Sequence, residues 1–160
     1  MKTKSTAEVE ICTNEGKYLL SEIQGLKEGA IVTGMYDSET GAFDFQYNGL
    51  DAVLWIGKNA RIVTDECYLK MKSIYPDALI LFRCGDFYET KYHDSLVASN
   101  VLGITRTRRM HEYDMYLAGF PYHALDTYLP KLIRSGCRVA IVDEPVKGAE
   151  KQVVETVNPK

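Results

Sequence analysis

The sequence predicts an α/β (α+β) fold after residue 63, preceded by a small antiparallel β unit. Two observations predict this division. Before residue 64, apolar residues form short runs and alternating patterns separated by Gly and charged residues, which is typical of strands and hairpins. From Thr64 onward, segments of helical spacing alternate with β-type runs, as in helices layered on a sheet. We therefore expect two domains, residues 1–63 and residues 64–160.

Size and composition narrow the class of protein. The 160 residues are 46% hydrophobic and 26% charged, as in soluble globular proteins. The apolar runs are too short to span a membrane, and the polar N-terminus shows no secretory signal. Four scattered cysteines without a CxxC pair predict reduced thiols and a cytoplasmic location. The net charge of −3 argues against purely electrostatic binding of nucleic acid, so DNA contact would need a local basic patch.

The first domain shows strand signals throughout. Short apolar runs occur at residues 18–20 and 31–32. Phe43, Phe45 and Tyr47 alternate with polar residues, which predicts a half-buried strand. Residues 37–41 read as a hairpin connection, and residues 57–59 as a second one between strands at 53–56 and 61–63. This region contains no catalytic constellation, and its function is not indicated by the sequence.

The second domain opens with a predicted helix. Thr64 is its expected N-cap, Asp65 and Glu66 occupy the first turn, and Pro76 ends it. A strand is expected at residues 78–82, and a second extended segment at 87–92 after a turn at Gly85. A short helix then opens at residue 94 or 95 and runs to residue 100.

The remaining elements alternate in the same way. Strands are expected at residues 104–108, 115–120, 139–142 and 153–157, with the third of these central and the fourth at an edge. Residues 122–135 have helical spacing, and Gly136 stands where a helix-ending glycine belongs. Pro130 conflicts with this helix, because an interior proline costs roughly 3 kcal/mol. We expect a kink or a late start there.

An aromatic residue and a carboxylate stand one residue apart after Gly85. In an extended segment, Phe87 and Glu89 point the same way while Tyr88 faces inward. An exposed phenylalanine beside a carboxylate suggests a binding partner. The alternative is that Phe87 is a core residue and Glu89 is solvated, because most phenylalanines are buried.

Three arginines cluster at the end of the predicted strand 104–108. Arg106 and Arg108 would lie on one side of this strand, with Thr105 and Thr107 on the other, and Arg109 follows. Guanidinium groups along a strand edge suit contact with phosphates. Such a cluster is also common on an ordinary solvated face.

Enzymatic patterns are sparse. The three histidines lack metal-ligand spacing, and Cys84 has no histidine placed to activate it, so we expect no metal, no cofactor and no catalytic residue. Asp77, Glu89 and Lys91 do match the PD…ExK pattern of metal-dependent nucleases. That chemistry requires both carboxylates at one Mg²⁺, which needs the segment after Gly85 to fold fully back along the first strand.

Several motifs occur together in the second domain, and with them residues 66–159 resemble the N-terminal mismatch-recognition domain of the DNA mismatch-repair protein family MutS. The matching segments, in chain order, are YLKMK (68–72), LFRCGDFYE (81–89), TRR (107–109), AGFPYHA (118–124), YLPKL (128–132), RVAIV (138–142) and VNP (157–159). GDFYE and AGFPYHA carry most of the specificity. The resemblance covers about the last three-fifths of the chain.

The resemblance implies a mixed sheet of about six strands with flanking helices, in a non-enzymatic DNA-binding module. Phe87 would enter the minor groove and stack on a mispaired base, while Glu89 contacts that base. Arg106, Arg108 and Arg109 would hold the DNA backbone. Supporting positions are Arg83, Gly85, Asp86 and Tyr88. The implied partner is double-stranded DNA with mismatches or distortions.

The departures from the family bear on function. No GxxxxGK[ST] phosphate-binding loop occurs, and the chain has no room for an ATPase, so we expect an isolated recognition module that binds DNA weakly. Cys84 stands where the family usually has Met or a similar apolar residue. The residues before Glu66 lie outside the resemblance and suggest a docking surface for a protein partner. A repurposed domain that mediates protein–protein interaction is therefore the second hypothesis, and the nuclease is the third.

Overall fold

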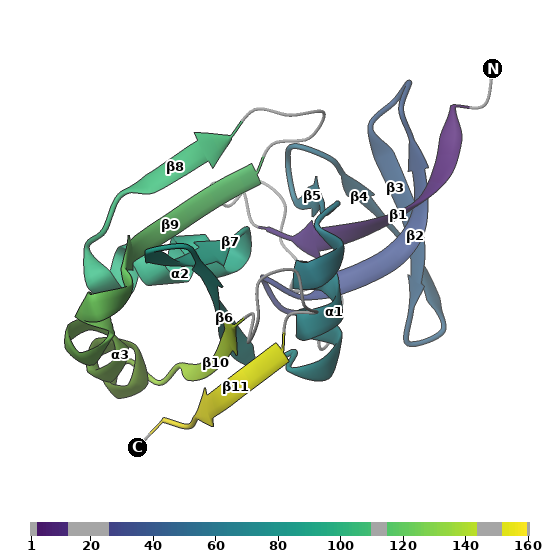
Figure 1. The fold of residues 1–160 in the computed structure, drawn as a ribbon. Coiled ribbons are helices and arrows are strands. Elements are labelled where there is room, and N and C mark those ends of the chain that lie inside the picture. The colour runs from purple at the N-terminus through teal and green to yellow at the C-terminus, as the bar shows by residue number, and fades with distance from the viewer. Residues whose placement is uncertain (1–2, 13–25, 110–114, 144–151, 160) are drawn as a thin grey trace. The chain divides into compact units, whose positions relative to one another are not determined.

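The computed structural model describes residues 3–12, 26–109, 115–143 and 152–159 (Figure 1). The chain forms two compact units, residues 1–64 and residues 65–160. The apolar run predicted at residues 18–20 lies outside the described residues. No helix of the described part is long and apolar enough to cross a membrane.

The first unit is a five-stranded antiparallel sheet with the order β4-β3-β2-β1-β5. Its core is apolar: Val9, Ile11 and Leu54 are buried, and the Phe43 and Phe45 rings stack with centroids 5.6 Å apart. The alternation predicted around residues 43–47 is therefore confirmed. The strands are β1 (Lys4–Ile11), β2 (Ile31–Asp37), β3 (Ala42–Tyr47), β4 (Leu50–Trp55) and β5 (Ala60–Ile62).

One of the two predicted hairpins is wrong. β5 pairs with β1 rather than with β4, to which it is linked by a single bridge between Ile56 and Ala60. The Asn59 side chain accepts a hydrogen bond from the Trp55 N–H (2.7 Å) in the connection between them. β4 and β5 lie at opposite edges of the sheet but are close in sequence, so the sheet must curl. The connection predicted at residues 37–41 is confirmed as the β2–β3 hairpin.

The second unit is a six-stranded mixed sheet with the order β11-β10-β6-β7-β9-β8. β6 and β10 are parallel, and every other pair in the sheet is antiparallel. The predicted fold class is confirmed. The strands are β6 (Ala78–Cys84), β7 (Phe87–Lys91), β8 (Arg106–Arg109), β9 (Met115–Pro121), β10 (Arg138–Asp143) and β11 (Gln152–Val157).

The helices differ from the predictions at their first residues. α1 (Glu66–Ile74) is capped by Asp65, whose side chain accepts from the Tyr68 N–H (3.0 Å), so the prediction of Thr64 as N-cap is wrong. α2 (His93–Leu102) begins one residue before the predicted window. α3 (Leu125–Arg134) starts late, after a 3₁₀ turn at Tyr122–Ala124, but Pro130 still lies inside it.

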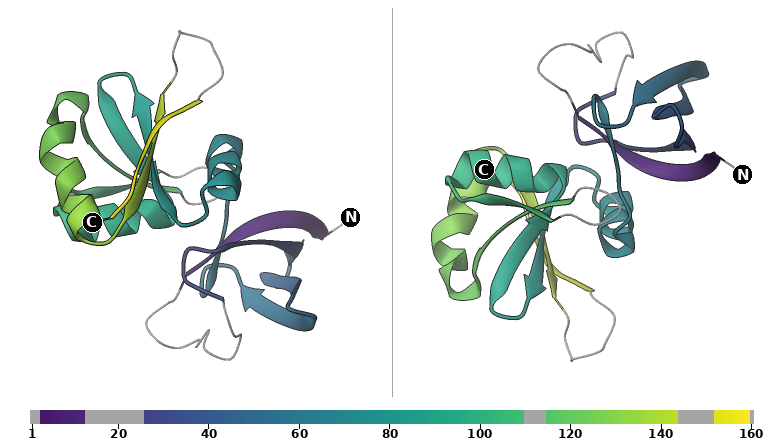
Figure 2. Two further views of the ribbon diagram at one scale, coloured as in Figure 1. Left: turned by 90° about the horizontal axis from the view of Figure 1, so that it is seen from below. Right: turned by 90° about the horizontal axis from the view of Figure 1, so that it is seen from above.

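The helices lie on both sides of the sheet, with α3 on the side opposite α1 (Figure 2). The main core forms where α2 and α3 cover the sheet. It includes Leu79, Leu81, Tyr88, Phe120, Leu132 and Ile141, each 8% exposed or less. Alternate residues of β6, Ile80 and Phe82, point to the other side and are also fully buried. β6 is therefore covered on both faces, which explains its continuous apolar run.

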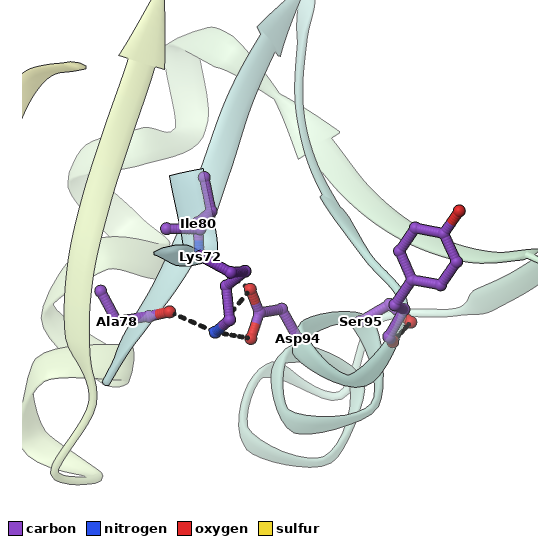
Figure 3. A network of polar contacts seen from close by, with 6 residues as sticks. Lys72, Ala78, Ile80, Asp94 and Ser95 are labelled. Carbon is purple, nitrogen blue, oxygen red and sulfur yellow. Dashed lines mark hydrogen bonds and ion pairs between the residues drawn. The ribbon is translucent and has the colours of Figure 1, made fainter. Parts of the chain in front are cut away.

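A buried ion pair completes the edge of β6 (Figure 3). β7 pairs with β6 only from Phe82 to Cys84, which leaves the backbone of residues 78–81 without a strand partner on that side. There the Ile80 N–H donates to the Asp94 carboxylate (3.0 Å), and the Lys72 ammonium donates to the Ala78 carbonyl (2.7 Å) and to Asp94 (3.1 Å). The two side chains thus satisfy backbone groups that a strand would otherwise bond.

Candidate nucleic-acid interface

The β6–β7 hairpin presents Phe87 at the start of β7. Cys84 and Phe87 are paired across the hairpin, so only Gly85 and Asp86 form the turn. Gly85 has φ = 60°, a left-handed conformation that glycine adopts without a steric penalty. The Asp86 carbonyl accepts a hydrogen bond from the Tyr122 N–H (2.8 Å), which ties the turn to the end of β9.

Successive side chains of β7 alternate between solvent and core. Phe87 is 48% exposed, Tyr88 is 8% exposed, and Glu89 is partly exposed. Tyr88 packs against Phe120 in the main core, with ring centroids 6.0 Å apart. The alternative in which Phe87 is a core residue is therefore wrong. Phe87 and Glu89 lie together on the face of β7 opposite Tyr88, as their spacing predicted.

A glycine on the neighbouring strand makes room for the Glu89 side chain. Gly119 is paired with Glu89 across the β7–β9 ladder. A β-carbon at position 119 would lie 3.3 Å from Glu89 Cγ and 2.9 Å from the Tyr88 carbonyl oxygen. The Glu89 side chain thus extends over the backbone of Gly119, which carries no side chain.

Arg83 and Tyr122 form a second aromatic feature beside the turn. The Arg83 guanidinium lies 3.9 Å from the Tyr122 ring centroid and 5.8 Å from that of Tyr88, and its Nε donates to the Gly85 carbonyl (2.6 Å). Tyr122 is 42% exposed. The helical spacing of residues 122–135 predicts Tyr122 inside a helix and gives no sign of this exposed ring. The nearby proline, which ends β9 at Pro121, was the available signal.

Arg106 and Arg108 lie on the other face of the sheet. Arg106 pairs with Ala118, and Ala118 pairs with Thr90. Residues paired across strands share a face, and Thr90 is on the same face as Tyr88, so Arg106 also lies on that face. Arg106 Nε donates to the Ser95 hydroxyl of α2 (3.1 Å).

Both guanidinium groups approach one ring on that face. Arg106 lies 3.9 Å and Arg108 6.0 Å from the ring centroid of Tyr116. The structure therefore does not bring Arg106 and Arg108 to the face that carries Phe87 and Glu89. Arg109 pairs with Met115 through its backbone, at the end of β8.

An ion pair lies at the far end of β7. The Lys91 ammonium contacts the Asp65 carboxylate (2.7 Å) and lies 4.6 Å from the Phe82 ring centroid. Burial alone would raise the pKa of Asp65. The hydrogen bond and charge of Lys91, together with the Tyr68 and Cys67 amides, nevertheless hold this pKa below its ordinary value. Lys91 is thus occupied in joining β7 to the start of α1.

The residues of the nuclease pattern do not converge. Glu89 is opposite Phe82, five residues along β6 from Asp77, which corresponds to roughly 16 Å of strand. Asp77 instead pairs with Arg138 (3.0 Å), and Lys91 pairs with Asp65. Within the described residues, no group of three His, Cys, Asp or Glu side chains gathers in a way that could hold a metal ion. The geometry therefore gives no support to shared Mg²⁺ ligation by Asp77 and Glu89.

Comparison with known proteins identifies the second unit. Residues 64–158 match the family described as MutS domain I. A DNA mismatch repair protein MutS of Bacteroides thetaiotaomicron is 60% identical over 79 residues, which cover 48% of this chain and 9% of that protein. The protein of the same name from Phocaeicola vulgatus is 57% identical over 79 residues, with the same coverage. That from Cytophaga hutchinsonii is 54% identical over 100 residues, 58% of this chain and 12% of the relative.

The chain thus spans only about a tenth of the length of these relatives. The family match covers more than half of the chain and coincides with the unit that carries Phe87 and Glu89. The chain belongs to the MutS domain I family.

Proposed function

We propose that residues 65–160 form a non-enzymatic module that recognises mispaired or distorted double-stranded DNA. The observation that carries this proposal is that the exposed Phe87 and the partly exposed Glu89 lie on one face of β7, in a unit of the MutS domain I family. In this proposal, Phe87 enters the minor groove and stacks on the unpaired or mispaired base. Glu89 contacts the same base.

The energetics of base stacking provide the selectivity. Inserting an apolar side chain between base pairs costs a few kcal/mol of unstacking per step. That cost is lowest where pairing is already broken, so a mismatch is the cheapest place for Phe87 to enter. The buried Tyr88 holds the backbone of β7 in place, so the exposed ring is presented by a rigid strand rather than by a loop.

Charge explains the role proposed for Glu89. A carboxylate close to DNA phosphates raises the free energy of every complex, and a hydrogen bond to an accessible base offsets this cost only at a disrupted pair. Glu89 therefore penalises matched DNA more than mismatched DNA. Tyr122, which Arg83 holds close to the same turn, supplies a second exposed ring for the sugar–phosphate edge.

The basic residues have a secondary role in the proposal. Residues 65–160 contain 13 basic and 13 acidic residues, so the unit has no excess positive charge. Arg106, Arg108 and Arg109 on β8 are the proposed phosphate contacts, with Arg106 and Arg108 on the sheet face opposite Phe87 and Glu89. With so few cations, binding by the single unit is expected to be weak.

The test is fluorescence anisotropy with labelled duplexes that are identical except for one G·T mismatch or one unpaired base. Wild-type protein is expected to bind the disrupted duplexes several-fold more tightly than the matched duplex. Phe87→Ala should abolish this preference without lowering stability, because the ring is half exposed. Ile74→Ala is the matched control, since Ile74 is also an exposed apolar residue (54%). Equal binding of all duplexes by wild type and Phe87→Ala would refute the proposal.

A further inference from the structure

The first unit has an exposed apolar face at the edge of its sheet. Val53 and Trp55 alternate on β4 with the buried Leu54 and are 48% and 39% exposed. Met35 on β2, 43% exposed, belongs to the same face, because it pairs with Asp44, which in turn pairs with Val53. Three large apolar side chains, on β2 and β4 with β3 between them, are thus presented to solvent on one face of the sheet.

Carboxylates lie among these apolar side chains. The register places Asp44 between Met35 and Val53, and Asp51 two residues from Val53 along β4. Gln46 donates to one oxygen of Asp51 (3.0 Å). Glu8 on β1 pairs with Thr33, two residues from Met35, and is also exposed. We call Met35, Val53, Trp55, Glu8, Asp44 and Asp51 the acidic–apolar face.

The net negative charge of the chain comes from this unit. Residues 1–64 contain nine acidic and six basic residues, a net charge of −3, whereas residues 65–160 contain 13 of each. The acidic–apolar face therefore belongs to a negatively charged unit and repels nucleic acid. A second copy of the chain would bring the same carboxylates together and is disfavoured for the same reason.

β4 also offers backbone hydrogen bonds at its outer edge. The Ile56 N–H donates to the Gly41 carbonyl (2.9 Å). Every second residue before Ile56 (Leu54 and Ala52) therefore also directs its backbone groups toward β3. By this alternation, Asp51 and Val53 direct their N–H and C=O groups away from β3. Among the described residues no strand pairs with β4 on that side. An exposed strand edge of this kind is a template for an added strand.

We propose that β4 and the acidic–apolar face bind an extended segment of a partner protein in which basic and apolar residues alternate. The segment adds to β4 as a strand through the outward backbone groups of Asp51 and Val53. Its apolar side chains and the aliphatic stems of its lysines or arginines pack on Val53 and Trp55, and its cationic groups reach Asp51 and, across β4, Asp44. This proposal is independent of DNA recognition by the second unit.

The chain contains a single tryptophan, Trp55, which reports directly on this face. The experiment titrates the full chain with a capped peptide that alternates Lys and Val, while Trp55 fluorescence is recorded. We expect a saturable blue shift and protection of Trp55 from acrylamide. Peptides with Lys replaced by Glu, or with Val replaced by Ser, should bind at least tenfold more weakly.

Matched variants distinguish binding at the acidic–apolar face from a general effect of net charge. Asp44→Lys with Asp51→Lys should weaken binding of the Lys–Val peptide at least tenfold. Glu39→Lys with Asp126→Lys changes the net charge equally at exposed positions outside the face and should leave binding unchanged. Similarly, Val53→Ser should weaken binding, whereas Leu50→Ser should not, because Leu50 is 66% exposed on the opposite face of β4.

Four outcomes would overturn the proposal. They are the absence of a saturable Trp55 response, equal weakening in the charge-matched control, equal binding of the Glu–Val peptide, and a concentration-dependent Trp55 shift without peptide, which would indicate self-association. Circular dichroism of each variant confirms that the sheet is intact. None of these outcomes depends on whether the chain discriminates mismatched from matched DNA.

Discussion

The Glu89 side chain lies over Gly119, with its Cγ 3.3 Å from the point where a β-carbon at residue 119 would stand. Any larger residue would also place that carbon 2.9 Å from the Tyr88 carbonyl oxygen, a backbone atom that cannot easily move. One glycine on β9 therefore sets the position of a carboxylate on β7.

Gly119→Ala should destabilise the second unit and displace Glu89. Steric conflict of this size typically costs about 1–3 kcal/mol. Urea denaturation followed by circular dichroism measures the loss, and Thr127→Ala at an exposed position of α3 is the control. If Gly119→Ala matched the wild type in both stability and DNA preference, the close approach would have no consequence.

Glu89→Gln should bind matched DNA more tightly than the wild type does. The substitution removes the negative charge near the phosphates but keeps hydrogen-bonding groups for a base. The ratio of matched to mismatched Kd should therefore fall several-fold, mainly through improved binding of matched duplex. Anisotropy titrations of both duplexes measure it. Glu155→Gln, at an exposed position of β11, should change neither Kd, and an equal gain in that variant would indicate a general charge effect.

Arg108→Gln should reduce the salt dependence of DNA binding. Each phosphate contact contributes about 0.9 to the slope of log K against log salt concentration. The variant should therefore lose about one unit of slope and weaken matched and mismatched binding alike. Arg134→Gln, an exposed cation of α3, should leave the slope unchanged. An unaltered slope in Arg108→Gln would remove Arg108 from the interface.

Lys72→Met should strongly destabilise the second unit. It leaves the Asp94 carboxylate, whose side chain is only 5% exposed, without its cation, and breaking a buried pair typically costs about 3–5 kcal/mol. Lys131→Met removes an exposed cation of α3 and should have little effect. Urea denaturation measures both. A loss no larger in Lys72→Met than in the control would mean that the pair does not support β6.

The same pair predicts a pH dependence. Burial raises the pKa of Asp94 above its ordinary value of 3.8, against the opposing effects of Lys72 and the Ile80 amide. Between the unfolded and folded pKa values, the folded state holds the extra proton, so stability falls as pH rises through this window. Lys72→Met should raise the folded-state pKa of Asp94 further, because the lost cation had favoured the ionised carboxylate. The pH range over which stability falls should then extend to higher pH. Urea denaturation across a pH series measures it, and a variant whose stability does not rise on acidification would contradict the assignment.

Much of the fold was predictable because local signals and tertiary contacts agree. The alternation of Phe43, Phe45 and Tyr47 and the continuous apolar run of β6 follow directly from which faces are buried. The second hairpin was predicted wrongly because a turn sequence indicates that the chain reverses, but not which strand it then joins. β5 pairs with β1, a strand far from it in sequence, and no local pattern specifies that partner.

The sequence alone determined the spacing of Phe87, Tyr88 and Glu89, since side chains of a strand alternate between its two faces. Only the tertiary structure decided that Phe87 is exposed while Tyr88 is buried, because α2 and α3 cover Tyr88. It also decided that Arg106 and Arg108 lie on the other face, since that depends on the register of β8 against β9. Gly119 and Asp94 act across strands far apart in sequence, and no local pattern marks such contacts.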